Sequence, residues 1–292
     1  MKTGDAFNFI MLAALWGASF LFMRVAAPEF GPFALMLMRC AIGALVLIPI
    51  CAARGKLGDL TRSWLPIGFV GVINSGVPFA LFGYSALILP AGMISVLNST
   101  APFFGALIAF AWLKERLSFW QSAGLAIGFG GVLVLVMSGG KLEVADPQSL
   151  LLGVGAGLLA AASYGLAASF MKRHLVGVDS LAGATGSQIA ASVSLLLPGL
   201  YFWPSASPSM QSWAAVIVLG VFSTAMAYLL YFRLIANLGP SRAITVTFAI
   251  PAFGIFWGAI VLAEPVSLLM LLGAALVVSG CVLTTGVWSR KS

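Results

Sequence analysis

Residues 101–118 read APFFGALIAFAWLKERLS, and residues 250–267 read IPAFGIFWGAIVLAEPVS. Both stretches carry a proline in second place, a Phe-Gly pair, a glutamate and a final serine, at a constant shift of 149 residues. Further matches lie at this shift, or at 148 for the first of them: Trp16-Gly17 and Tyr164-Gly165, Pro49 and Pro198, Asn74-Ser75 and Ser223-Thr224, Asn98 and Thr247, Gly124 and Gly273. We call this shift, 149 residues or 148 for the stretch around Trp16, the repeat offset. Self-similarity at one fixed offset predicts that the chain is a duplication of one structural unit.

The composition indicates which solvent surrounds most of the chain. Of its 292 residues, 61% are hydrophobic and only 8% are charged, whereas soluble proteins average about 25% charged residues. The bilayer must therefore surround most of the surface, and in lipid only helices and closed barrels satisfy their own peptide groups. Long runs such as residues 150–171 are apolar on every face, which is typical of spanning helices. We predict an all-α membrane protein.

The apolar runs predict ten transmembrane helices, because each spanning helix needs about 20 apolar residues. The expected ranges are 6–26, 32–52, 65–87, 91–113, 119–138, 150–172, 181–203, 213–235, 240–262 and 267–287. The first run continues to about residue 27 without a small-x-small cleavage site, so it is interpreted as a helix and not as a signal peptide. The short connections leave no room for an extramembrane domain.

The basic residues predict how these helices are oriented. The net charge of +7 could suggest nucleic-acid binding, but Lys and Arg are scattered singly at helix ends. Twelve of them fall at the end that would hold both termini, against Arg24 and Lys141 at the other. Cytoplasmic loops carry such an excess, so we predict a multi-pass protein of the bacterial inner membrane with both termini cytoplasmic and without nucleic-acid partners.

Each half of the duplication would hold five helices. The predicted halves are residues 1–138 and 149–288. Because five is odd, the second half must sit upside down relative to the first. Inverted repeats recur in secondary transporters, where the substrate site lies near the bilayer midplane and the two halves exchange conformations. This arrangement predicts alternating access through a central cavity.

The chain also resembles a known family. Ala101-Pro102 with Glu115, Ile250-Pro251 with Glu264, Trp16-Gly17 in the first helix and Arg39 in the second are similar to the EamA-type drug/metabolite transporters. The resemblance covers nearly the whole chain and implies export of amino acids or other metabolites, and the midplane aromatic residues make it most similar to bacterial aromatic amino acid exporters. It implies a small-molecule substrate, lipid around the helices and no cofactor. We expect a monomer, with a homodimer through Gly124-x-x-x-Gly128 or Gly153-x-x-x-Gly157 as the alternative.

Polar and aromatic side chains at one depth form the candidate substrate site. These residues are Trp16, Ser19, Asn74, Ser75, Asn98, Tyr164, Ser223, Thr224, Tyr228, Thr247 and Trp257. Hydroxyl groups could meet a carboxylate, and aromatic rings could form apolar or cation-π walls. The alternative for each polar residue is a hydrogen bond between helices that only supports packing. The cysteines Cys40, Cys51 and Cys281 show no paired spacing, so neither a disulfide nor a metal site is expected.

Two prolines and one arginine complete the candidate residues. Pro102 and Pro251 should kink their helices, freeing carbonyls near Asn98 and Thr247 for an ammonium group or providing a hinge. Arg39 lies well inside a span and could contact an anion, pair with Glu29 or helix-end carbonyls, or extend its charge toward the surface.

The acidic residues favour facilitated transport over proton coupling. No Asp or Glu lies in the middle of a predicted span, and Glu115 and Glu264 at helix ends are expected to pair or cap. A proton-coupled drug or metabolite exporter is the alternative within transport. A channel or lipid-flipping subunit is a second one. An intramembrane enzyme is not expected, because Gly83-Tyr84-Ser85-Ala86-Leu87 lacks the last glycine of a nucleophile elbow and the single His174 lies in a loop.

Overall fold

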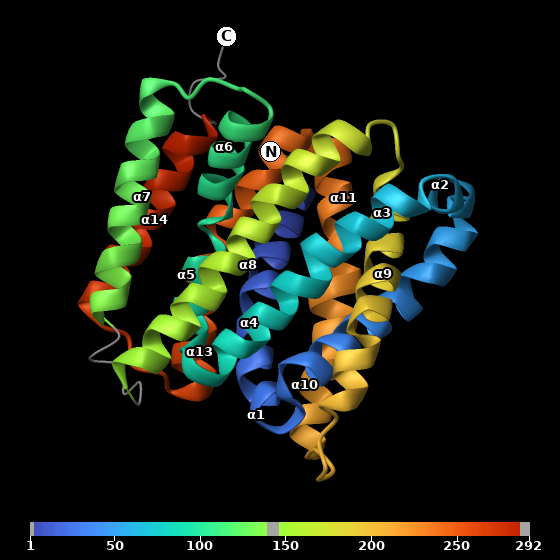
Figure 1. Cartoon of the computed structure of the whole chain (residues 1–292), viewed down its shortest axis with the longest axis horizontal. Coiled ribbons are helices and arrows are strands. Elements are labelled where there is room, and N and C mark those ends of the chain that lie inside the picture. Colours follow the sequence, from blue (N-terminus) through green and yellow to red (C-terminus); the bar gives the residue numbers. More distant parts are fainter. Residues whose placement is uncertain (1–2, 139–145, 287–292) are drawn as a thin grey trace.

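The computed structural model describes residues 3–138 and 146–286, and these residues form helices and connections without a strand (Figure 1). Within the described residues, nine helical stretches are long and apolar enough to cross a membrane. They are Thr3–Ala53, Trp64–Ile88, Ala91–Trp112, Phe119–Ser138, Pro147–His174, Ser180–Tyr201, Met210–Leu238, Ile244–Leu262 and Leu268–Thr285. The predicted all-helical membrane protein is thereby confirmed. Lys2, Lys141, Trp288, Arg290, Lys291 and the outer ends of the predicted halves, residues 1 and 288, lie outside the described residues.

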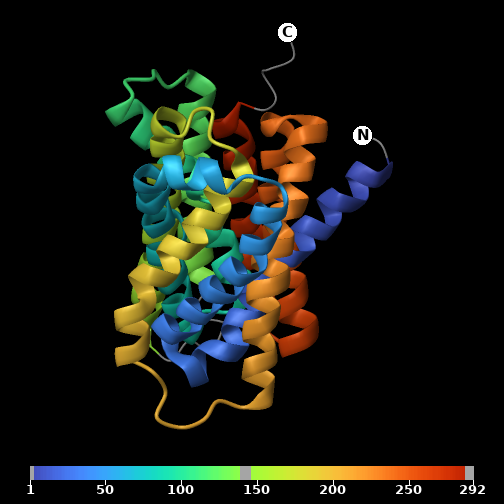
Figure 2. The ribbon, with the colours of Figure 1, turned by 90° about the vertical axis from the view of Figure 1, so that its right-hand side faces the viewer.

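Helix α1 (Thr3–Ala53) contains two of the predicted spans. Its 51 residues would extend for about 75 Å at the usual rise, more than twice the hydrocarbon thickness of a bilayer. At Gly31 the backbone leaves the helical region (φ 69°, ψ 164°), so two helices meet there. Only glycine adopts this conformation readily. Figure 2 shows the first part of α1, in dark blue, leading to the N-terminus apart from the second part, in lighter blue.

Two spans are wound more loosely in the middle than an α-helix. The π-helical segment η1 (Val72–Gly76) joins α3 (Trp64–Gly71) to α4 (Val77–Ile88), and η3 (Val221–Met226) joins α10 (Met210–Gly220) to α11 (Ala227–Leu238). The hydroxyl of Thr224 donates to the carbonyl of Leu219, five residues earlier, at 2.8 Å. The two segments start one repeat offset apart. Such π segments are frequent at functional sites.

The predicted helices 91–113 and 240–262 are interrupted. The first consists of α5 (Ala91–Asn98) and α6 (Ala101–Trp112). The second consists of α12 (Pro240–Ala243), the 3₁₀ segment η4 (Ile244–Phe248) and α13 (Ile250–Leu262). Pro102 and Pro251 lie in the first turns of α6 and α13. A backbone N–H there would have no partner within the helix, so the N–H that proline lacks is not missed. Each interruption thus lies directly before the proline expected to kink the span, and the proline begins the helix that follows.

The remaining helices are α2 (Leu57–Arg62), α7 (Phe119–Ser138), α8 (Pro147–His174), α9 (Ser180–Tyr201) and α14 (Leu268–Thr285). Polar residues that directly precede a helix determine where several helices begin. Asp146, Asp179, Ser209 and Ser267 each accept a hydrogen bond from a backbone N–H in the first turn of α8, α9, α10 and α14. Such caps satisfy N–H groups that have no partner within the helix.

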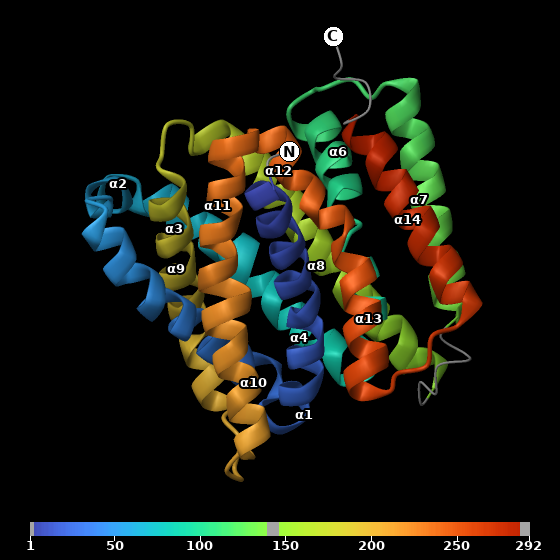
Figure 3. The ribbon, with the colours of Figure 1, turned by 180° about the vertical axis from the view of Figure 1, so that it is seen from behind.

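Helices α7 and α14 lie side by side at one edge of the bundle (Figures 1 and 3). A Cβ on Gly124 would lie 2.7 Å from the carbonyl oxygen of Gly280, and a Cβ on Gly131 2.9 Å from that of Gly273. Glycine therefore allows the two backbones to touch. Gly128 likewise faces Phe103 within the molecule. The face of Gly124-x-x-x-Gly128, one of the two considered for a homodimer, is thus occupied by packing within the molecule.

Candidate functional site

A cavity of about 630 Å³ lies between the helices and reaches one end of the bundle. At that end its lining includes Leu175, Val178 and Asp179 in and around the connection between α8 and α9. The same end carries a cluster of positive charges, and we call it the basic end, defined by Arg54, Lys56, Arg62, Lys172 and Arg173. A volume of this size is typical of sites for small organic molecules.

Most of the predicted site residues line this cavity. They are Trp16, Ser19, Arg39, Asn74, Asn98, Pro102, Tyr164, Ser223, Thr224, Tyr228 and Thr247. Three others do not, namely Ser75, Pro251 and Trp257. The indole N–H of Trp257 donates to the carbonyl of Ala14 at 3.2 Å, which directs this ring toward α1. Pro251 is buried in the first turn of α13, and Ser75 is fully buried behind the wall.

Aromatic side chains form two matched pairs in the cavity wall. The rings of Trp16 and Tyr231 lie 5.3 Å apart, and those of Tyr164 and Phe82 lie 6.0 Å apart. Tyr164 follows Trp16 by the repeat offset, and Tyr231 follows Phe82 by it. Tyr231 and Phe82 were missed from sequence, although the offset could have indicated them. The four rings supply flat, apolar contact area with polar edges.

Arg39 brings a positive charge to the cavity wall although its side chain is only 5% exposed. Its Nε donates to the hydroxyl of Thr224 at 3.0 Å, and its Nη1 lies 3.9 Å from the sulfur of Met23. Its guanidinium carbon lies 3.9 Å from the ring centroid of Phe79, a cation-π contact. None of the ion pairs among the described residues includes Arg39.

The ion pair of Arg39 with Glu29, one of the alternatives predicted from sequence, is wrong. The Glu29 carboxylate instead accepts hydrogen bonds from the backbone N–H and the hydroxyl of Ser209, the latter at 2.8 Å. Ser209 belongs to the connection between α9 and α10, which projects at the end of the bundle opposite the termini (Figure 2). Glu29 therefore ties this connection to the bend of α1.

A second cluster repeats the surroundings of Arg39 without the charge. Gln188 follows Arg39 by the repeat offset, and its Nε2 donates to the hydroxyl of Ser75 at 3.0 Å, as Arg39 donates to Thr224. Tyr228, the counterpart of Phe79, lies beside Ser75 and Gln188. The two clusters are therefore alike in arrangement and differ in charge.

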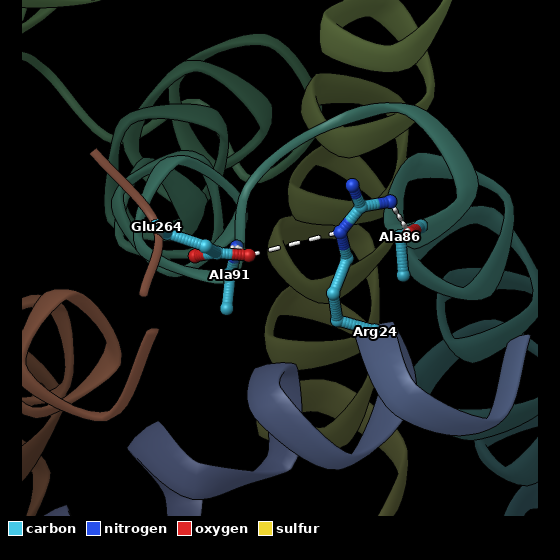
Figure 4. A network of polar contacts seen from close by, with 4 residues as sticks. All are labelled: Arg24, Ala86, Ala91 and Glu264. Atoms are coloured by element: carbon cyan, nitrogen blue, oxygen red, sulfur yellow. Dashed lines mark hydrogen bonds and ion pairs between the residues drawn. The ribbon is translucent and has the colours of Figure 1, made fainter. Parts of the chain in front are cut away.

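The end of the cavity opposite the basic end is sealed by a polar network (Figure 4). Arg24 donates from Nη1 to the carbonyl of Ala86 at 2.9 Å, and its Nε lies 3.7 Å from Oε1 of Glu264. The N–H of Ala91, which begins α5, donates to Oε2 of Glu264 at 2.9 Å. Burial raises the pKa of the Glu264 carboxyl, against the lowering effects of the Ala91 N–H and the Arg24 guanidinium. We call Arg24, Ala86, Ala91 and Glu264 the sealing network.

Backbone packing of α5 against α13 supports this seal. A Cβ on Gly254 would lie 2.3 Å from the side chain of Ser95, and a Cβ on Gly92 would lie 2.9 Å from Ile255. The two helices therefore touch at the level of their backbones. Water and solute cannot pass between surfaces in such contact.

The basic end holds only part of the equivalent network. Lys172 pairs with Glu115. Lys172 follows Arg24 by 148 residues, the shift that also relates Trp16 to Tyr164, and Glu115 precedes Glu264 by 149. The counterpart of Ala91 is Pro240, which has no N–H to offer Glu115. The side chains of Lys172 and Glu115 are 65% and 49% exposed, against 33% and 13% for Arg24 and Glu264. This end is therefore open where the other is closed.

Comparison with known proteins identifies relatives along the whole chain. The model described as "EamA-like transporter family" matches residues 6–137 and 151–286. Two proteins of Bacillus subtilis, the uncharacterized transporters YoaV and YvbV, are 26% and 28% identical, covering 97% and 100% of this chain and 97% and 95% of theirs. A protein of Streptantibioticus cattleyicolor named "Probable terminal-alkyne amino-acid exporter" is 24% identical over 94% of this chain and 91% of its own. One solved crystal structure matches with a TM-score of 0.67 and 18% identity over 100% of both chains, a likeness of fold alone.

Proposed function

Because the chain belongs to the EamA-like transporter family, we propose that this multi-pass membrane transporter exports small organic metabolites, with neutral amino acids, aromatic ones foremost, as its substrates. The observation that carries the proposal is the cavity of about 630 Å³ lined by Trp16, Tyr164 and hydroxyl-bearing side chains. The relative named as an amino-acid exporter supports this substrate class.

The proposed architecture has ten spans in two inverted halves, residues 1–138 and 149–288. The bend at Gly31 supports ten spans, because it divides α1 into two helices. Matched contacts support the two halves. Arg39 and Gln188 donate to the hydroxyls of Thr224 and Ser75, which are themselves one repeat offset apart. The contact of Gly124 with Gly280 is likewise repeated by the contact of Gly273 with Gly131. The excess of Lys and Arg at the basic end supports a cytoplasmic position for it, and hence both termini inside a bacterial inner membrane.

The proposed mechanism is alternating access by exchange of these two halves. In this structure the cavity is closed at the sealing network and reaches the basic end, the geometry of an inward-open carrier. Closing the basic end while parting α5 from α13 would present the same cavity to the outside. Asp179 is the only carboxylate among the lining residues and lies at the mouth, which supports facilitated movement down the solute gradient.

The decisive experiment is uptake of radiolabelled aromatic and aliphatic amino acids into proteoliposomes. Trp16→Ala and Tyr164→Ala should each lower the saturable flux by about tenfold, since losing about 1.4 kcal/mol of contact free energy has that effect. Trp120→Ala and Tyr201→Ala are the matched controls, because these rings are 64% and 83% exposed. Both controls should transport normally.

The alternatives predict different outcomes of the same assay. Absence of flux above empty liposomes for every amino acid would reject the proposed substrate class. Uphill accumulation driven by acidifying one side would support the proton-coupled drug or metabolite exporter. Flux that does not saturate would support a channel.

A further inference from the structure

The cavity contains one buried charge with no opposite charge beside it. Arg39 is 5% exposed, lines the cavity and has a hydroxyl, a thioether and an aromatic ring as its neighbours. Within the described residues no carboxylate pairs with it. Removing an arginine from water without a counter-ion is unfavourable, and the cation-π contact with Phe79 offsets only part of this cost. Binding of an anion in the cavity would offset the rest.

A second observation marks the same part of the wall. The hydroxyl of Ser223 is buried, lines the cavity and has no hydrogen-bond partner. Its neighbour Thr224 already donates to Leu219 and accepts from Arg39. A buried hydroxyl without a partner is costly, and in native proteins its partner is usually a water molecule or a ligand. Ser223 thus has a free hydroxyl donor directly beside Thr224, the residue to which Arg39 donates.

We propose that Arg39, with the Ser223 hydroxyl, forms a carboxylate subsite, and that the transporter recognises its substrates by this carboxylate and an apolar body, without requiring an α-amino group. The substrate class is then the apolar and aromatic monocarboxylates, of which neutral amino acids are one part. This inference rests on the proposed function, because it concerns the same cavity.

Counting charges supports one carboxylate over other groups. A single arginine neutralises one negative charge, whereas a phosphate monoester carries close to two at neutral pH. An ammonium group would need an acceptor of negative charge, yet among the described residues Asp179 is the only carboxylate in the lining. Asp179 pairs with Lys56, with its Oδ2 3.4 Å from Nζ, and also caps α9. The cavity thus offers a substrate amino group neutral contacts only.

The neutral counterpart cluster orients the substrate. If both clusters carried arginine, a monocarboxylate could bind in either of two directions. Gln188 stands where the repeat would place that second arginine. The carboxylate therefore binds on the Arg39 side, and the apolar body extends toward the rings of Trp16 and Tyr164.

The test uses four probes that share a phenyl ring. These are phenylalanine, phenyllactate, phenylpropionate and phenethylamine. The shift of the thermal unfolding temperature measures binding to the detergent-purified protein, and competition with radiolabelled phenylalanine measures transport. The three carboxylates should bind with affinities within about tenfold of one another, and the amine, which lacks the carboxylate, should not bind.

Substitutions locate the subsite. Arg39→Gln, which copies the counterpart at position 188, should weaken binding of phenylpropionate by about 10- to 100-fold, the range for a charge-assisted hydrogen bond. Ser223→Ala should weaken it several-fold and serves as the test if Arg39→Gln does not fold. Arg54→Gln, a change at the exposed basic end, is the matched control and should bind normally.

The outcomes separate this inference from the proposed function. Binding of phenylalanine and phenethylamine without phenylpropionate would overturn the carboxylate subsite and leave amino acid transport standing. Binding of phenylpropionate that depends on Arg39, without any amino acid flux, would support the subsite and reject amino acids as the transported class. Unchanged phenylpropionate binding in Arg39→Gln and Ser223→Ala would also overturn the inference.

Discussion

At the scale of single residues, two glycines determine how closely the cavity walls approach each other. A Cβ on Gly17 would lie 2.5 Å from Cβ of Phe253, and a Cβ on Gly165 would lie 2.5 Å from the backbone nitrogen of Gly105. These contacts are related by the repeat offset. Each glycine lies next to a cavity aromatic, so the position of that ring depends on the close approach.

Alanine at either glycine should therefore destabilise the protein. We expect Gly17→Ala and Gly165→Ala each to lower the free energy of unfolding by about 1–3 kcal/mol, because the added methyl group overpacks a helix contact. The thermal unfolding temperature in detergent measures this. Gly155→Ala is the control on the same helix as Gly165, since nothing lies within 4 Å of its added Cβ. A loss of stability in the control as large as at Gly165 would contradict the steric explanation.

The protonation of Glu264 should stabilise the seal. Burial raises the pKa of this carboxyl in the sealed state, and water reaches it when the seal parts, which returns the pKa toward its ordinary value. The Glu264 carboxyl therefore binds a proton more readily in the sealed state than in the open state. Protonated Glu264 stabilises the sealed state at low pH, and this stabilisation is lost as the pH rises through the raised pKa.

Thiol labelling at Ser95→Cys from the sealed side measures this effect, since Ser95 is buried under Gly254. Labelling should slow on acidification after correction for the ionisation of the thiol. Glu264→Gln should lose this pH dependence. Faster labelling at low pH in the unmodified network would show that protonation breaks the seal.

At the scale of elements, the sequence predicted where the spans lie but not how they bend. Runs of apolar residues locate spans because the bilayer demands length and hydropathy. The same runs are apolar on every face, so their periodicity cannot show which side chains face lipid and which face the cavity. From sequence, Trp16 and Trp257 are expected at the same depth, yet of the two only Trp16 lines the cavity, because the indole of Trp257 is directed toward α1. The prolines marked interruptions without showing that new helices start there, and nothing signalled the π segments.

The bend in α1 should depend on glycine at position 31. Gly31 has φ 69° and ψ 164°, and nothing lies within 4 Å of an added Cβ. The cost of Gly31→Ala is therefore conformational alone, and we expect about 1–3 kcal/mol of lost stability. Thermal unfolding compared with Gly4→Ala, whose added Cβ is equally free of contacts, measures it. Equal stability of the two variants would mean that the bend adapts to a side chain.

At the scale of the whole molecule, the two ends of the cavity carry unequal polar networks. Glu264 accepts from the N–H of Ala91, whereas Pro240 cannot donate to Glu115 in the same way. If the halves exchange conformations, the seal at the basic end lacks one charge-assisted hydrogen bond. The carrier should therefore rest with the basic end open, as in this structure.

Restoring the missing N–H should shift this balance. Pro240→Ala allows a bond to Glu115 and should slow labelling of a cysteine at Ala168, a cavity-lining position, by a few-fold up to about tenfold. Labelling with an impermeant thiol reagent from the basic side measures it. Pro147→Ala, also in a helix first turn, is the control. Combining Pro240→Ala with Glu115→Gln should remove much of the effect, and persistence of the full effect would point to backbone flexibility instead.

The crossing of α7 and α14 has a consequence for the history of the gene. Gly124 meets Gly280 and Gly131 meets Gly273. Because Gly273 is the counterpart of Gly124 and Gly280 that of Gly131, each of these two contacts is the repeat-related copy of the other. A self-matching contact of this kind is what a twofold pair of identical chains must have. Two copies of an ancestral five-helix protein could have associated through this surface before their genes were fused, and the crossing preserves that interface within one polypeptide.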